Sequence, residues 1–213
     1  MRRVLSAIAP ITLAAWMLVS GVAVSGSITM AAAQAPNAAE AGTFVTRMAR
    51  TALDDLTLPS VPEAQRTKRF QELMDETFDV PLISRFVLGR YWRQATEAER
   101  AEYTRLFREL IVQSYARRFS DFSGAQFRVT GTSPPNEDGD VMVAVEGTIP
   151  AKPSVKLDVR VRQVKSTQKV IDVAIEGVSM AMTQRDEFAS VIQRGGGNLE
   201  ALLASLRERV GQR

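Results

Sequence analysis

The chain of 213 residues contains neither cysteine nor histidine. Without cysteine it can form no disulfide framework and offers no thiol nucleophile. Without histidine it has no Ser–His or Cys–His catalytic pair and no imidazole ligand for a metal ion. The side chains left for chemistry are carboxylates, lysine, tyrosine and serine. These absences favour a binding protein over an enzyme.

The N-terminus has the order of parts found in a secretory signal peptide. Arg2 and Arg3 precede an uncharged apolar stretch over residues 4–24, and a run of small residues follows. Cleavage after Ala33 fits this order better than cleavage after Ala35, because the second cut leaves a proline at the new N-terminus. An uncleaved inner-membrane anchor is the alternative, since the apolar stretch exceeds the ~7–15 residues usual in a signal. Either way, we expect the rest of the chain in the periplasm.

The net charge is also small once the signal is removed. Loss of residues 1–33 leaves 180 residues, enough for one domain with a hydrophobic core. It removes two basic residues and no acidic one, so the formal net charge falls from +3 to +1. So small a charge attracts nucleic acid weakly, and we expect no nucleic-acid partner. Residues 34–43 are small and polar and predict a flexible tether before a single domain over residues 44–213.

Apolar residues at spacings of three and four predict helices in the first and last parts of the domain. Thr96 and Glu99 form a capping-box pattern at the start of the longest of them, and Asp79 and Asn198 suit N-caps of two others. Glycines 195–197 are expected to stop the helix before the last one. The predicted helices cover about 44–56, 62–78, 79–89, 97–119 and 183–195, with a last one from 199.

After Gly124 the apolar period changes to two, which is typical of strands. Four such segments follow, near residues 127–130, 141–146, 156–162 and 170–176. Each has one apolar and one mostly polar face, so they predict a four-stranded antiparallel sheet covered on one side. Helices, then a sheet, then helices is an α+β order. Patterning alone leaves open whether these layers close on a packed core or enclose an apolar cavity.

Two segments carry a family resemblance: FVLGRYWRQAT at residues 86–96 and VIDVAIEGVSM at residues 170–180. Together with Arg185-x-x-Phe188 and the glycine run before the last helix, they resemble the MlaC family, also called toluene-tolerance or ABC-transporter auxiliary proteins. The resemblance covers residues 44–209 in the expected order. The chain departs from it at Gln168, where family members often carry tryptophan.

The resemblance implies N-terminal helices, a curved four-stranded antiparallel sheet and C-terminal helices around an apolar pocket, similar to nuclear-transport-factor-2-like and cystatin-like folds. It further implies a periplasmic carrier that moves phospholipids between an outer-membrane lipoprotein complex and an inner-membrane ABC transporter complex with a membrane-anchored substrate-binding subunit. It implies no cofactor. A hopanoid-associated branch, HpnM, has the same domain and remains an alternative.

The candidate lipid-binding residues are apolar or aromatic side chains on the predicted helices and on the strands' apolar face. Tyr91 and Trp92 either form part of the pocket mouth or pack in a core corner. Arg90 and Arg93 are candidates for the lipid phosphate, because guanidinium groups suit phosphate geometry; the alternative is a solvated face. The full set of predicted lipid contacts is Phe86, Tyr91, Trp92, Phe107, Leu110, Tyr115, Val143, Val145, Leu157, Val159, Val161, Val173, Ile175 and Met180.

Two other functions remain open. A hydrolase or isomerase of the same fold requires a carboxylate or tyrosine inside the cavity. The charged strand residues fall on the polar face, where Asp172 and Glu176 are expected to pair with basic residues of the neighbouring strand, so we expect no catalytic residue. A ligand-free periplasmic adaptor would instead have a filled core.

Overall fold

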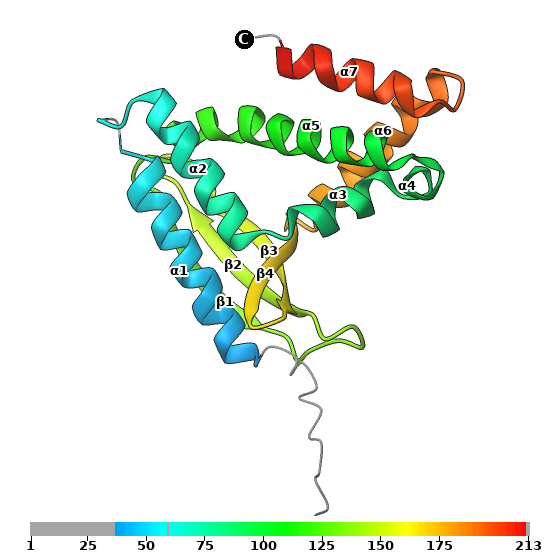
Figure 1. Ribbon diagram of the computed structural model, residues 1–213. Helices are drawn as coiled ribbons and strands as arrows, with labels where there is room; N and C mark the ends of the chain where they lie inside the picture. The colour runs from blue at the N-terminus through cyan, green and yellow to red at the C-terminus, as the bar shows by residue number, and fades with distance from the viewer. Residues whose placement is uncertain (1–36, 59, 212–213) are drawn as a thin grey trace, which may run out of the picture. The chain divides into compact units, whose positions relative to one another are not determined.

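Helices precede an antiparallel sheet and further helices follow it, as the sequence predicts (Figure 1). The structure is a computed structural model that describes residues 37–58 and 60–211, all within one compact unit. The predicted signal peptide over residues 1–33 and its cleavage site lie outside the described residues. The first half contains helices α1 (Ala38–Leu56), α2 (Glu63–Thr77), α3 (Val80–Leu88), α4 (Tyr91–Gln94) and α5 (Glu97–Ala116), and a 3₁₀ turn over Arg117–Phe122.

The sheet has five antiparallel strands in sequence order: β1 (Gln126–Thr132), β2 (Val141–Thr148), β3 (Val155–Val164), β4 (Thr167–Ile175) and β5 (Val178–Ser179). The predicted α+β fold is confirmed, and the sheet has one additional strand, β5, which has two residues and pairs with the end of β4. β4 begins at Thr167, so Gln168 lies inside the strand, opposite Gln163. Helices α6 (Met180–Arg194) and α7 (Leu199–Gly211) complete the fold.

The tether predicted over residues 34–43 is wrong from residue 38 onward, where α1 already begins. The side chain of Asn37 accepts a hydrogen bond from the Ala39 N–H at 3.1 Å, which caps the helix. Alanine has the highest helix propensity, and residues of this first turn pack against the sheet, with Ala41 fully buried. Small side chains therefore indicate close helix–sheet contact here, and not flexibility.

Local capping sets the start of several helices. At α5, the Thr96 N–H donates to Glu99 Oε2 at 2.7 Å and the Glu99 N–H donates to Thr96 Oγ1 at 3.3 Å, which confirms the predicted capping box. Asp79 caps α3 through the Leu82 N–H, also as predicted. The predicted start of α6 at Thr183 is late by three residues, because Ser179 caps this helix through the Met182 N–H.

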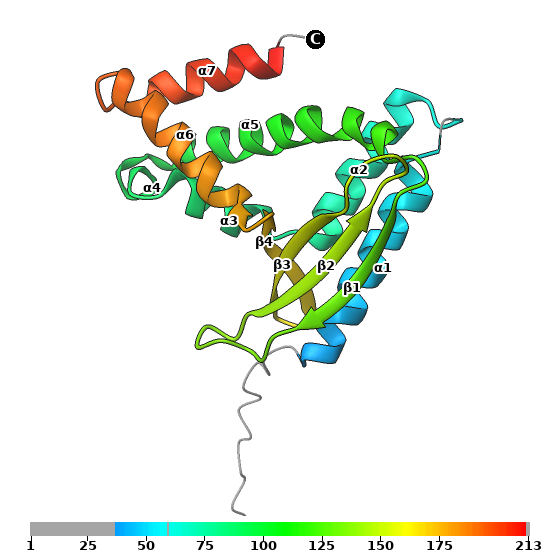
Figure 2. The same ribbon diagram turned by 180° about the vertical axis from the view of Figure 1, so that it is seen from behind.

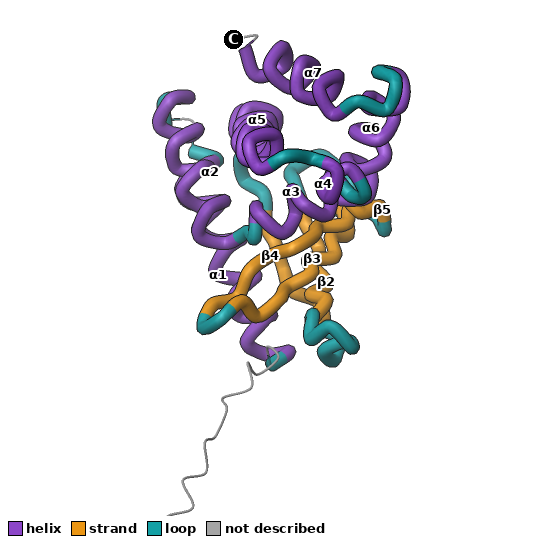
Figure 3. Tube along the Cα trace, turned by 45° about the vertical axis from the view of Figure 1, so that its right-hand side comes forward, coloured by secondary structure: helices purple, strands orange, loops and turns teal. Residues whose placement is uncertain are grey.

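Buried apolar residues form two clusters. One lies among α2, α3, α5, α6 and α7 and contains an aromatic group formed by Tyr103, Phe107 and Phe188. The ring centroids of these three residues lie within 6.2 Å of one another, and Phe188 meets the other two rings edge to face. The other lies between α1 and the sheet, where Phe44 and Val45 meet the valines of β2, β3 and β4. The helices of the first cluster lie beyond one end of the strands, while α1 runs along the sheet (Figures 2 and 3).

A bulge in β4 changes which residues face α1. The register of β3 and β4 shifts between Val161, which pairs with Val170, and Arg160, which pairs with Asp172, so Ile171 is the extra residue. Val170 is consequently fully buried against α1, although strict alternation predicts that it lies on the polar face. Strict alternation fails because the bulge moves the residues before it to the opposite face.

Candidate functional site

An apolar cavity of about 240 Å³ lies among α2, α3, α5, β4 and α6. Segments far apart in the sequence form its wall, because the bulged part of β4 lies beside the link between α2 and α3. There the Asp79 N–H donates to the Val170 carbonyl at 3.0 Å. The lining residues are Phe70, Met74, Phe78, Val80, Ile83, Val87, Phe107, Ile111, Tyr115, Phe119, Ile171, Asp172, Val173, Met180, Ala181 and Gln184.

Three helical stripes supply half of the residues of this wall. Phe70 and Met74 are one turn apart on α2, and Phe107, Ile111 and Tyr115 follow each other at intervals of four on α5. The residues from α3 are Val80, Ile83 and Val87, at intervals of three and four. Side chains at such spacings lie on one face of a helix, so each helix presents a continuous apolar strip to the cavity.

The cavity wall contains few polar side chains, and its carboxylate forms hydrogen bonds within the protein. Asp172 accepts hydrogen bonds from Ser179 Oγ at 2.6 Å and from the Ala181 N–H at 3.2 Å, and so anchors the first turn of α6. Burial raises the pKa of the Tyr115 hydroxyl, so this group stays neutral. Gln184 is the only other polar side chain among the lining residues.

The expected pairing of Asp172 and Glu176 with basic residues of β3 is wrong. Glu176 accepts a hydrogen bond from the backbone N–H of Lys156 at 2.7 Å, and Asp172 bonds to α6. Arg162 instead binds the buried Asp140 through two hydrogen bonds, at 2.6 and 2.9 Å. The cavity wall therefore contains one carboxylate, but its hydrogen bonds go to the backbone and a hydroxyl, and no second carboxylate or lysine stands beside it among the lining residues.

The structure brings together four of the predicted lipid contacts, Phe107, Tyr115, Val173 and Met180, in the cavity wall. Leu110 is buried within the helical cluster. Four strand valines do not reach the cavity, because α1 covers the face on which they lie: Val143, Val145, Val159 and Val161. Leu157 is half-buried at the margin of this second core, and Ile175 is exposed at the end of β4.

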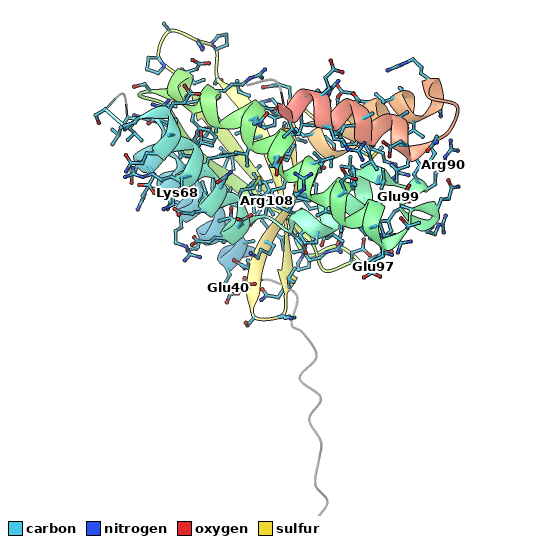
Figure 4. The ribbon with its side chains drawn as sticks, turned by 45° about the horizontal axis from the view of Figure 1, so that its top comes forward. Glu40, Lys68, Arg90, Glu97, Glu99 and Arg108 are labelled. Carbon is cyan, nitrogen blue, oxygen red and sulfur yellow. The ribbon has the colours of Figure 1, made fainter. Side chains whose placement is uncertain are left out.

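The segment around α4 forms a corner of the helical core and contributes nothing to the cavity wall. Tyr91 is buried and Trp92 is half-buried against the same cluster. Arg90 donates a hydrogen bond to the Tyr91 hydroxyl at 2.9 Å, and Arg93 is exposed. Arg90 lies at the same corner as Glu97 and Glu99, on the side opposite Lys68 (Figure 4). Phe86 is exposed on α3 beneath the guanidinium of Arg185, 5.2 Å from the ring centroid.

Sequence reasoning missed all of the wall from α2 and α3. The signal was present in α3, where apolar residues occur on more than one face of a nine-residue helix. Val80, Val87 and Leu88 are buried in the helical cluster, and Val80, Ile83 and Val87 also line the cavity.

Comparison with known proteins agrees with this architecture. The family model described as MlaC protein matches residues 46–208. The fold is similar to that of the phospholipid-binding protein from Ralstonia solanacearum, whose structure was solved in complex with a phospholipid. The two chains are 24% identical and superpose with a TM-score of 0.71 over 81% of this chain and 97% of the other. Among the described residues, no helix combines the length and the apolar character that a membrane span requires.

Proposed function

The chain belongs to the MlaC protein family, and on this premise we propose that it is a periplasmic phospholipid carrier whose cavity receives the acyl tails. The observation that supports the proposal is the cavity itself, since thirteen of its sixteen lining residues are fully apolar. The phospholipid-binding protein from Ralstonia solanacearum, which has a similar fold and was solved in complex with a phospholipid, supports the same assignment. Binding requires no catalysis, and the carboxylate of the cavity wall, Asp172, is held by hydrogen bonds from Ser179 and the Ala181 N–H at the start of α6.

The tail contacts assigned under this proposal are the residues of the cavity wall. Phe107, Tyr115, Val173 and Met180 remain from the sequence prediction, and the stripes of α2 and α3 are added to them. Arg90 and Arg93 remain candidates for the head group only if the phosphate extends to the corner at α4, because neither residue lines the cavity.

The cavity must widen to hold a whole lipid. A cavity of ~150 Å³ accommodates one benzene molecule, so 240 Å³ corresponds to roughly ten carbon atoms. A diacyl phospholipid has about thirty tail methylenes, which represent roughly 24 kcal/mol of gross apolar transfer at ~0.8 kcal/mol each. This free energy is available to separate the packed walls as the tails enter, and the net affinity is what remains after that cost.

The same free energy explains why a carrier needs partners. Tails that leave an apolar cavity for water lose their burial, so release requires a partner that offers another apolar site. We propose that these partners are an outer-membrane lipoprotein complex and an inner-membrane ABC transporter complex with a membrane-anchored substrate-binding subunit. The carrier then crosses the periplasm between them, after export by its signal peptide.

The test is native mass spectrometry of the exported protein, followed by organic extraction and identification of the lipid. We expect a phospholipid at close to one molecule per chain. A hopanoid at the same ratio would keep the carrier function but assign it to the hopanoid-associated branch. A protein that is empty and also takes no lipid from vesicles would refute the carrier and favour the adaptor.

A further inference from the structure

A second depression in the surface lies between α1 and β1, and it shares no residue with the lipid cavity. Its walls are one stripe of α1 and the last part of β1, which run side by side (Figures 1 and 2). The lining residues are Ala39, Gly42, Thr43, Thr46, Arg47, Arg50, Thr51 and Asp54 of α1 and Val129, Thr130, Gly131 and Thr132 of β1.

One wall is an open sheet edge. β1 is the terminal strand of the sheet, so no described strand pairs with its outer side. The strand is most accessible where it borders the groove, since Thr130, Gly131 and Thr132 are all exposed. The register shifts between Val129 and Gly131, so Thr130 is an extra residue, and the other outward N–H and C=O groups of this edge can pair with another extended chain.

Short side chains make up most of the opposite wall. The residues of the α1 stripe with short side chains are Ala39, Gly42, Thr43, Thr46 and Thr51. At Gly42 the two walls meet, because a Cβ there would lie 3.3 Å from Thr132 Cγ2. The stripe from Ala39 to Asp54 is roughly 22 Å long at 1.5 Å per residue. The part of β1 that borders the groove, residues 129–132, is shorter, so an extended segment can pair with β1 over roughly 13 Å of this length.

The charges of the groove select the occupant. Arg47 and Arg50 are exposed on neighbouring turns and form no hydrogen bond or ion pair with any residue that the structure describes. Several other described arginines are paired, as Arg108 is with Asp75 and Arg207 with Glu102 and Glu200. Asp54 is the only carboxylate in the groove. Two unpaired guanidinium groups beside an open strand edge suit an extended peptide that carries carboxylates on one face.

We infer that the groove between α1 and β1 is a docking site for an acidic, extended segment of a partner protein, which adds a strand to β1 and places its carboxylates against Arg47 and Arg50. This is β-strand addition between an edge strand and a helix, in which backbone hydrogen bonds supply affinity and side-chain contacts supply selectivity. Because the groove and the cavity are separate, a partner held here leaves the cavity free to exchange lipid.

The probe for this site is a synthetic peptide with the sequence (Glu-Val)₄, which places all glutamates on one face when extended. Titration monitored by backbone NMR should shift the amides of β1 and of the α1 stripe, and amides of β1 should gain protection from hydrogen exchange. The (Lys-Val)₄ peptide is the charge control. A (Glu-Val)₄ peptide N-methylated at alternate residues keeps its charge but loses half of its N–H donors, and should bind at least tenfold more weakly.

The protein variant is the double substitution Arg47→Glu and Arg50→Glu, compared with Arg194→Glu and Arg209→Glu as a matched pair on α6 and α7. Only the first should weaken peptide binding, by at least tenfold in low salt, with less difference in high salt. The inference is overturned if the peptide fails to shift β1 at millimolar concentration, if the N-methylated peptide binds equally well, or if both variants bind alike. These readouts do not depend on lipid content, so they stand apart from the test of the carrier function.

Discussion

Filling the cavity should separate lipid binding from folding, and Ala181 offers a direct way to do so. This residue is 6% exposed and lines the cavity at the start of α6. The substitution Ala181→Phe adds one phenyl ring, the size of a benzene molecule, which requires ~150 Å³. The cavity of about 240 Å³ can take this ring and then retains little free space.

The two effects of Ala181→Phe have opposite signs. Burial of a phenylalanine side chain contributes ~1.5–3 kcal/mol, and forcing extra atoms into a packed core costs ~1–3 kcal/mol. Because the ring enters a cavity, the free energy of unfolding should stay within ~1 kcal/mol of the wild-type value. The ring displaces about six methylenes of lipid tail, equivalent to ~5 kcal/mol of gross transfer or roughly a thousandfold in affinity.

The assay compares Ala181→Phe with Ala204→Phe, an equal change at an exposed position of α7. Chemical denaturation measures stability, and native mass spectrometry after incubation with phospholipid vesicles measures lipid uptake. We expect both variants to be folded and only Ala181→Phe to be empty. A folded Ala181→Phe protein that carries lipid as the wild type does would refute the assignment of this cavity to the acyl tails.

Three further predictions concern stability. Burial raises the pKa of the Tyr103 hydroxyl above its ordinary value near 10, so the unfolded state loses this proton first and the free energy of unfolding should fall above pH ~10, by up to ~1.4 kcal/mol per pH unit. The Tyr103→Phe variant should show a smaller slope in denaturation experiments between pH 9 and 11.5. An unchanged slope would contradict the assignment to Tyr103. The Thr96→Ala substitution removes the capping box of α5 and should lower the free energy of unfolding by ~1 kcal/mol. The control Thr104→Ala, in the middle of the same helix, should lower it less. Equal losses of stability in urea denaturation would argue against capping. The Asp140→Asn substitution weakens the charge-assisted hydrogen bonds between the buried Asp140 and Arg162, and should lower the free energy of unfolding by ~1.5–3 kcal/mol in the same assay. A loss below ~0.5 kcal/mol would contradict this prediction.

Much of the fold could be predicted because many of its boundaries are local. The capping box at Thr96 and the cap at Asp79 each involve groups within four residues, so the sequence contains both partners of the interaction. The same reasoning misplaced the start of α1, where the alanines after Asn37 are compatible with a tether and with a helix. The burial of Ala41 and the close approach of Gly42 to Thr132 of β1 decide between the two, and the second contact spans ninety residues of sequence.

The candidate site was predicted less well, for a reason that Val143 and Ile83 make clear. A period of two places Val143 on the apolar face of its strand, but the period does not reveal what covers that face. In the structure α1 covers it and leaves no space for a ligand. Ile83 lies on a short helix whose apolar residues face two ways, and only the position of β4 shows that one of these sides borders a cavity.

By itself, the sequence determined the secretory pattern, the α+β order, the family resemblance and the helix caps, because each depends on composition or on neighbours along the chain. The tertiary structure alone decided that the cavity lies among α2, α3, α5, β4 and α6, and that α1 fills the face of the sheet where the lipid contacts were expected. The bulge at Ile171 shows why the sequence pattern and the tertiary structure disagree for β4. One extra residue reverses the facing of a strand, and only its pairing with β3 shows where the reversal occurs.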